Sequence, residues 1–142
     1  IPYTRRSKII ESIQPKSKVL IGDTLGEMDF YLGLADVVFV GASFTDMGGH
    51  NIIEPLSAGC PVIMGPSTYG VDFFATPAQQ AGVFETFETP HAMYAYLLAL
   101  NKDLPSVLMK QKKAKAFASL NSDTAKLTVK SIKKHNSYTN KS

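Results

Sequence analysis

The feature that most constrains this chain is an alternation of short apolar runs with segments of helical length. Three runs end in glycine, namely Lys18–Gly22, Asp36–Gly41 and Pro61–Gly65. They are short and rich in aliphatic side chains, which is typical of strands buried inside a parallel sheet. Helical patterns follow them at residues 26–35, 51–58 and 71–81, the last interrupted near Pro77. Strands that alternate with helices predict an α/β fold, a parallel sheet with helices on both faces.

The rest of the chain continues the pattern and then becomes helical. We expect a fourth strand at residues 81–86, followed by helices at 90–100, 104–120 and 122–134. Four strands are fewer than a doubly wound domain usually has, so we expect further strands to precede Ile1. The predicted organisation is one partial domain over residues 1–135 and a frayed polar tail over 136–142.

Composition and charge narrow the class of protein. Cys60 is the only cysteine and cannot form an internal disulfide, and the three histidines are too dispersed to suggest a metal site. The longest uncharged apolar stretch, residues 92–101, is too short to cross a bilayer. Residues 110–142 carry nine lysines and one acidic residue, whereas residues 1–109 are net acidic. This basic segment indicates either an anionic partner surface or a lysine-coated amphipathic helix.

Three glycine-bearing loops follow the carboxyl ends of the predicted strands, where open parallel sheets bind ligands. They are Gly22–Glu27, Gly41–Asn51 and Gly65–Thr68. Glycine lets a backbone approach a ligand closely, and a following helix presents free N–H groups to an anion. Gly48 and Gly49, just before a predicted helix, therefore form the best phosphate cradle in the chain.

Glu54 is the candidate for binding a ribose. It lies three residues after Asn51, so the two side chains share one face of the predicted helix. A carboxylate beside a phosphate site is useful if it accepts hydrogen bonds from ribose hydroxyls, as in dinucleotide-binding folds. The alternative is that residues 51–54 form only a helix-capping box without a ligand.

Other nucleotide and hydrolytic chemistries lack their motifs. The glycine-rich segments match neither the Walker pattern nor the Gly-x-Gly-x-x-Gly fingerprint, which argues against an ATPase or a dehydrogenase. Ser43 has no histidine and aspartate arranged as in a triad, so nucleophilic catalysis is not expected. Few aromatic residues are interleaved with the lysines, which argues against nucleic-acid binding.

Four segments in order resemble the transferases of 3-deoxy-D-manno-octulosonic acid (Kdo) in lipopolysaccharide synthesis. They are Gly22–Glu27, Ala35–Ser43, Gly48–Pro55 and Gly59–Pro66. The resemblance extends from about Arg5 to about Ile132, and the combination of all four segments is specific. It implies a Rossmann-like domain, the C-terminal half of a two-domain GT-B glycosyltransferase, which binds the sugar donor CMP-Kdo without a metal cofactor.

The resemblance also assigns roles to residues. Gly48, Gly49 and Asn51 are expected to approach the phosphate, and Glu54 to hold the ribose. The full set of residues expected at the sugar donor is Gly22, Asp23, Thr24, Gly26, Glu27, Gly41, Ser43, Gly48, Gly49, His50, Asn51 and Glu54. No catalytic residue is expected here, because the family's N-terminal domain supplies the general base and binds the lipid A precursor. The chain alone is therefore expected to lack transferase activity.

Three positions depart from the family's usual pattern. Ile52 replaces a proline, Ala42 a glycine and Ser67 a histidine, and the last change weakens any role of that loop in recognising the sugar carboxylate. The resemblance implies a peripheral protein on the cytoplasmic face of the bacterial inner membrane. Two other functions remain open: a UDP-sugar transferase domain similar to MurG, and a nucleotide-binding module without catalysis.

Overall fold

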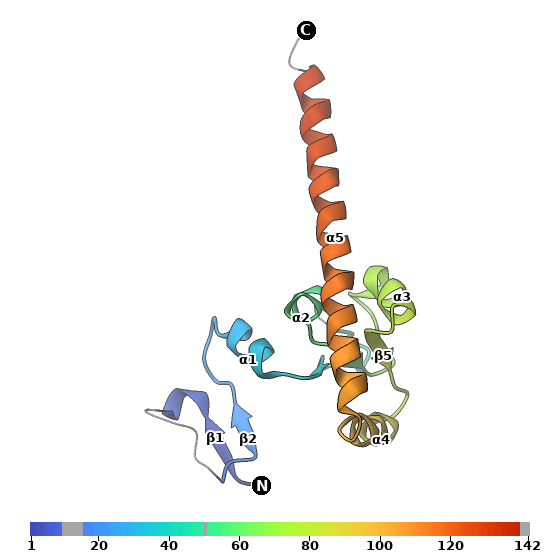
Figure 1. Ribbon diagram of the computed structural model, residues 1–142. Coiled ribbons are helices and arrows are strands. Elements are labelled where there is room, and N and C mark those ends of the chain that lie inside the picture. The colour runs from blue at the N-terminus through green and yellow to red at the C-terminus, as the bar shows by residue number, and fades with distance from the viewer. Residues whose placement is uncertain (10–15, 50, 140–142) are drawn as a thin grey trace. The chain divides into compact units, whose positions relative to one another are not determined.

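The structure is a computed structural model that describes residues 1–9, 16–49 and 51–139, with side chains as far as Asn121. The chain divides into two compact units, Ile1–Gly33 and Leu34–Ser142. Figure 1 labels most of the helices and strands. Both units contain parallel strands connected through helical segments, so the predicted α/β class is confirmed.

The first unit is built around a pair of parallel strands. It contains β1 (Tyr3–Arg5), the short 3-10 helix η1 (Arg6–Lys8), β2 (Val19–Ile21) and most of α1 (Met28–Leu34). In the register of this pair, Tyr3 lies opposite Val19 and Arg5 opposite Ile21. The sequence did not predict β1, because its three residues lack an apolar run.

The second unit contains a three-stranded parallel sheet in the order β3-β4-β5. Its elements are β3 (Val38–Phe39), α2 (Ile53–Ala58), β4 (Val62–Met64), α3 (Asp72–Gln80), β5 (Phe84–Thr86), α4 (Pro90–Leu100) and α5 (Leu104–Thr139). The sequence predicted one sheet of four strands. Among the described residues, β2 instead pairs with β1, and β3, β4 and β5 form their own sheet.

The core of the second unit lies on one face of this sheet. Strand β4 is buried along its whole length, and Val62 and Met64 point into the core. Three helices cover that face, as the core cluster shows: Ile52, Leu56, Val62, Met64, Val71, Ala75, Ala78, Val83, Phe84, Ala114, Phe117 and Ala118. Helix α5 passes along α2 (Figure 1) and supplies the last three of these residues.

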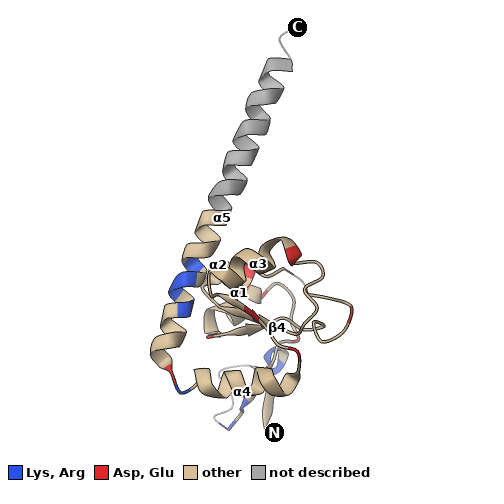
Figure 2. Cartoon of the chain, turned by 90° about the vertical axis from the view of Figure 1, so that its right-hand side faces the viewer, with Lys and Arg blue, Asp and Glu red and all other residues tan. Residues whose placement is uncertain are grey.

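Helix α4 lies on the other side of the sheet (Figure 2). Glu85 follows Phe84 in β5 and therefore points away from the core, where it accepts a hydrogen bond from Tyr96 of α4. The helix starts where the sequence indicates, with Pro90 in its first turn and the Thr89 hydroxyl accepting a hydrogen bond from the Ala92 amide. The sheet of the second unit thus has helices on both faces, as predicted.

Two helices differ from the sequence prediction. Helix α3 is continuous through Pro77, which removes one backbone hydrogen bond without ending the helix. The break expected near Asn121 is absent, because α5 is a single helix from Leu104 to Thr139. The Asn121 side-chain nitrogen donates to the Phe117 carbonyl at 2.8 Å. No glycine or proline follows Pro105 to stop it. Residues 136–139 belong to this helix, and residues 140–142 of the expected tail lie outside the described residues.

Candidate functional site

Ser43 joins the loops that follow β3 and β4. Its hydroxyl donates to the Val40 carbonyl at 2.7 Å and accepts from the Gly65 amide at 2.8 Å. Its carbonyl accepts from the Ser67 amide at 3.0 Å. The residue is 0% exposed, so its side chain fixes the two loops against each other and does not line a surface. A ligand in these loops would depend on Ser43 through the backbone that it positions.

Gly48 and Gly49 lie at a second backbone contact between the two loops. The Gly49 amide donates to the Tyr69 carbonyl at 3.0 Å. A Cβ on Gly48 would lie 2.2 Å from that carbonyl oxygen, and one on Gly49 would lie 2.2 Å from the Met64 methyl carbon. The φ of Gly48 is +71°, in the region that favours glycine. Packing and backbone conformation therefore require glycine at position 48, whether or not a phosphate lies on it, whereas a Cβ at position 49 would have to displace the end of the Met64 side chain.

Asn51 and Glu54 are exposed on the same stretch of chain. The Asn51 side-chain oxygen accepts from the Ile53 amide at 2.9 Å, which fixes the entry into α2. Glu54 lies in the first turn of α2 and points to solvent, as a residue that binds a ribose must. Helix α2 has only six residues and begins at Ile53, so its dipole contributes little to anion binding. His50, the remaining predicted residue of this loop, lies outside the described residues.

Gly41 and Ala42 begin the same loop. Gly41 is exposed, and a Cβ there would meet nothing within 4 Å, so neighbouring atoms do not require glycine. Ala42, which departs from the family's glycine, has a φ of +65°. A non-glycine residue in that region is strained, and a Gly-Gly pair would remove the strain.

The carboxylates of the Gly22–Glu27 loop are held within the first unit. The Ser7 amide and hydroxyl donate to Asp23 at 2.9 and 2.7 Å. Arg6 donates two hydrogen bonds to Glu27, at 2.7 and 3.1 Å, and the Thr24 hydroxyl donates a third. The hydrogen bonds from Ser7 lower the pKa of Asp23, and those from Thr24 and Arg6 lower the pKa of Glu27. Both carboxylates are therefore ionised at neutral pH and serve to hold the loop against residues 6 and 7.

A cavity of about 420 Å³ lies at this loop. Gly22, Thr24, Gly26 and Glu27, all predicted at the sugar donor, line it together with Leu25, Met28 and Tyr31. A Cβ on Gly22 would lie 2.7 Å from the Tyr31 ring, so any other residue there would have to displace that side chain. The Tyr31 hydroxyl is buried and has no hydrogen-bond partner among the described residues. Of the predicted residues of the first unit, all but Asp23 thus line one cavity. The described ones of the second unit lie between the end of β3 and the first turn of α2.

Sequence reasoning missed Arg6, Ser7 and Tyr69. Arg6 is 21 residues from Glu27 and Ser7 is 16 residues from Asp23, and no local pattern links them. Tyr69 directly follows the predicted glycine-bearing loop Gly65–Thr68. It also precedes Gly70 in the segment after β4, and this sequence signal indicates a turn at the ligand-binding edge of the sheet.

Glu85 of β5, Tyr96 of α4 and Lys110 of α5 form a polar cluster where these three elements meet. The Glu85 oxygen accepts from the Tyr96 hydroxyl at 2.9 Å and pairs with the Lys110 ammonium at 2.7 Å. Burial and the hydrogen bond to Glu85 raise the pKa of Tyr96. Burial opposes the charge of Lys110, but its bonds to Glu85 and Tyr96 outweigh burial and raise its pKa. The cluster ties α4, α5 and β5 together and keeps Lys110 charged.

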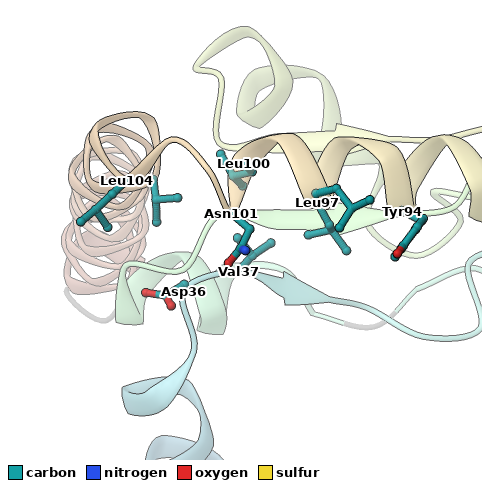
Figure 3. Close-up of a pocket in the computed structure, with 9 residues that line it drawn as sticks. Asp36, Val37, Tyr94, Leu97, Leu100, Asn101 and Leu104 are labelled. Atoms are coloured by element: carbon teal, nitrogen blue, oxygen red, sulfur yellow. The ribbon is translucent and has the colours of Figure 1, made fainter. Parts of the chain in front are cut away.

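A cavity of about 480 Å³ lies at the opposite edge of the sheet, beside the amino end of β3. Its lining is mostly apolar, as Figure 3 shows: Val37, Leu97, Leu98, Leu100, Leu104 and Val107, with Asp36, Tyr94 and Asn101. Parallel sheets of this class bind ligands beyond the carboxyl ends of their strands. The cavity is larger than the one at the Gly22–Glu27 loop, but its position does not fit that rule.

Neither a metal centre nor a reactive thiol is found in the described part of the chain. No group of three or more histidine, cysteine, aspartate or glutamate residues there could hold a metal ion. Cys60 is buried, and burial raises the pKa of its thiol, so a thiolate nucleophile is disfavoured. Among the described helices, none is long and apolar enough to span a bilayer.

Known proteins show similarity to this chain in sequence and in fold. A scan against protein-family models found no match. A 3-deoxy-D-manno-octulosonic acid transferase of Bordetella pertussis is 49% identical over 82 residues, which are 58% of this chain and 19% of the relative. The transferase of Haemophilus influenzae is 36% identical over 85 residues, covering 59% and 20%. The chain thus spans about a fifth of the length of these curated relatives.

A solved structure shares the fold. The crystal structure of the C-terminal CMP-Kdo binding domain of WaaA from Acinetobacter baumannii matches with a TM-score of 0.73 and 24% sequence identity. The match covers 82% of this chain and 60% of that one. In sequence the chain is thus similar to a segment of the Kdo transferases, and in fold to a C-terminal CMP-Kdo binding domain.

Proposed function

We propose that this chain binds CMP-Kdo as the sugar-donor part of a Kdo transferase of the GT-B class. The named relatives support the reaction, and the WaaA domain supports the ligand. The observation that carries the proposal is the exposure of Asn51 and Glu54 directly after the Gly48–Gly49 contact, at the carboxyl edge of the sheet. This is where a Rossmann-like sheet receives a nucleotide.

In the proposed complex, the loop that ends at Asn51 receives the phosphate and Glu54 the ribose. A ribose offers two adjacent hydroxyls, and an ionised carboxylate can accept a hydrogen bond from each. Because α2 is short, the backbone of the loop and the Asn51 side chain must supply most of the phosphate contacts. Gly41 and His50, which stand in the same loop of the sequence, belong to the same proposed site.

The proposed reaction is an inverting transfer without a metal. The bond between Kdo and the CMP phosphate breaks as an acceptor hydroxyl attacks the sugar, and CMP leaves with the electron pair. Hydrogen bonds to the phosphate stabilise the charge that develops on it. The general base and the lipid A precursor would come from the part of the protein outside this chain. We therefore expect this chain to bind the sugar donor without turning it over.

The basic segment supports a peripheral place on the cytoplasmic face of the inner membrane. Figure 2 shows lysines gathered along the described part of α5, at positions 110, 112, 113 and 115. Lys110 is engaged by Glu85, which leaves the others for an anionic lipid surface. Each lysine near such a surface contributes about 1 kcal/mol. Co-sedimentation with vesicles containing anionic lipid should show binding that weakens with salt, and salt-insensitive binding would contradict it.

Calorimetric titration with CMP and with UDP tests the proposal. The chain should bind CMP more tightly than UDP, and Glu54→Ala should weaken CMP binding by about tenfold, as expected for the loss of hydrogen bonds to a charged group. Asp36→Ala is the matched control, because Asp36 carries the same charge at the amino end of β3. It should bind CMP as the parent does.

Three other outcomes would change the assignment of the chain or of Glu54. Tighter binding of UDP would assign the chain to a UDP-sugar transferase similar to MurG. Equal CMP binding by the parent and Glu54→Ala would refute the ribose contact. Binding of CMP without Kdo transfer, once the chain is joined to the remaining part of a relative, would leave a nucleotide-binding module without catalysis.

A further inference from the structure

Tyr69 stands in a tight turn beside the candidate site. The Val71 amide donates to the Thr68 carbonyl at 2.9 Å, and Gly70 between them has a φ of +88°. A positive φ at the third turn residue is the mark of a type II turn, which requires glycine there. The Thr68 hydroxyl also donates to Asp72 at 2.6 Å, so the turn is tied to the start of α3. The backbone of Tyr69 is therefore held in place by hydrogen bonds within its own loop.

The backbone of Tyr69 also contacts Gly48 and Gly49 of the loop after β3. The Tyr69 carbonyl accepts from the Gly49 amide, and a Cβ on Gly48 would lie 2.7 Å from the Tyr69 Cβ. A Cβ on Gly70 would lie 2.9 Å from the Gly49 carbonyl oxygen. These contacts leave no room for a side chain between the two loops. The Tyr69 ring thus originates next to the loop that is proposed to receive the phosphate.

The side chain itself is 72% exposed, although its backbone is held on both sides. A single exposed aromatic residue needs no explanation by itself. Here the backbone that carries the ring is held at the ligand-binding edge of the sheet. The side chain has only two torsions, so ordering it on binding costs little conformational entropy. Exposed aromatic faces of this kind are where rings of nucleotides stack.

We propose that Tyr69 packs its ring against a ring of the bound nucleotide sugar, either the cytosine or the transferred sugar. The inference rests on the proposed function and adds a side-chain contact from the loop after β4. Stacking of a base on an aromatic side chain contributes enough that its removal weakens binding by about 5- to 150-fold. The contact should depend on the ring and not on the hydroxyl.

Nuclear magnetic resonance titrations of the chain with ribose 5-phosphate, CMP and CMP-Kdo test this proposal. Tyr69→Ala should bind ribose 5-phosphate as the parent does, because that ligand lacks both rings in question. If the ring stacks on cytosine, binding of CMP and CMP-Kdo should both weaken by at least fivefold. If it packs on the sugar, only binding of CMP-Kdo should weaken.

Two further variants and one stability measurement complete the test. Tyr69→Phe should bind within about twofold of the parent, since it keeps the ring. Tyr94→Ala removes an exposed tyrosine from α4 and should change none of the three affinities. Thermal unfolding of Tyr69→Ala should match the parent, because the lost ring is exposed.

The outcomes separate this proposal from the proposed function. If the parent binds CMP and Tyr69→Ala binds all three ligands equally well, the Tyr69 contact is refuted and the function stands. Equal losses in Tyr69→Phe and Tyr69→Ala would refute the ring contact in favour of the hydroxyl. A parent chain that binds neither CMP nor CMP-Kdo would refute both.

Discussion

The Gly65 amide donates a buried hydrogen bond of 2.8 Å to the Ser43 hydroxyl. This bond links the end of β4 to the loop after β3, and the same hydroxyl donates onward to the Val40 carbonyl. One side chain of two heavy atoms therefore satisfies a donor and an acceptor that the packing of the loops would otherwise leave unpaired. The geometry of the candidate site therefore depends on Ser43, although Ser43 is not part of the surface of that site.

Replacement of Ser43 by alanine should lower the free energy of unfolding by about 1–3 kcal/mol, because the buried Gly65 amide would lose its partner. Chemical denaturation measures this change. Ser57→Ala is the control, since its hydroxyl also bonds to a backbone carbonyl, that of Ile53, but at an exposed position. It should cost less than about 0.5 kcal/mol. Equal effects in the two variants would contradict the role given to Ser43.

Gly48 and Gly82 make a matched pair for separating strain from packing. Both have a positive φ, +71° and +70°, but the nearest atom to a Cβ on Gly82 is the flexible Lys113 ammonium at 3.8 Å. Gly82→Ala should therefore cost only the backbone strain, about 1–2 kcal/mol. Gly48→Ala should cost about 1–3 kcal/mol more, because the Tyr69 carbonyl cannot move aside. Denaturation of both variants tests this, and equal costs would refute the clash.

The Glu85, Tyr96 and Lys110 cluster should make the second unit sensitive to alkaline pH. The folded pKa values of Tyr96 and Lys110 both lie above the usual 10.0 and 10.5. The folded state therefore holds its protons more tightly than the unfolded state, so this stabilisation is complete below about pH 10 and is lost as pH rises through the folded pKa values. Thermal unfolding as a function of pH should show this decline.

Lys110→Met removes the ammonium while keeping an unbranched apolar stem that is one atom shorter. It should cost about 1 kcal/mol at neutral pH, as expected for a well-formed partly exposed ion pair. Its alkaline decline should be shallower than that of the parent. Lys112→Met is the control, because Lys112 is exposed and lies on the same helix. A decline of the same steepness in Lys110→Met and the parent would refute the assignment.

The contacts that hold the Gly22–Glu27 loop should weaken at acidic pH. The pKa values of Asp23 and Glu27 lie below the usual 3.8 and 4.5. Their stabilisation is therefore present above those usual values and is lost as pH falls through the lower folded values. Hydrogen exchange of residues 22–27, measured from pH 6 down to pH 3, should report the loop loosening. Arg6→Met and Asp23→Asn should loosen it already at pH 6, and unchanged exchange in both would contradict the contacts.

The sequence predicted the elements that depend on local patterns. Strand β4 was identifiable because Val62, Ile63 and Met64 form an uninterrupted apolar run before Gly65. The end of α2 was identifiable because Gly59 is a natural helix stop, and in the structure it has a φ of +93°. Strand β1 was missed because its pairing with β2 depends on partners sixteen residues away. The continuity of α5 was missed because polar residues such as Asn121 reduce the apolar periodicity without breaking a helix.

The candidate site was predictable at the level of loops and only partly at the level of side chains. Glycine spacing and strand ends located the loop of Gly48 and Gly49 and the exposed Glu54. The burial of Ser43 and the engagement of Asp23 by Ser7 follow from tertiary contacts that no spacing encodes. The role of these residues at the sugar donor remains a prediction that the binding experiments test.

The contribution of α5 to the core has a consequence for how the chain folds during synthesis. Ala114, Phe117 and Ala118 close the apolar cluster that β4, β5, α2 and α3 begin. While a ribosome is still adding residues before position 114, that cluster remains open to water on one side. The second unit therefore cannot reach its native state as its strands emerge, and its folding must wait until the helix has left the exit tunnel. A nascent chain arrested before Ala114 should accordingly stay sensitive to protease, long after all its strands have been made.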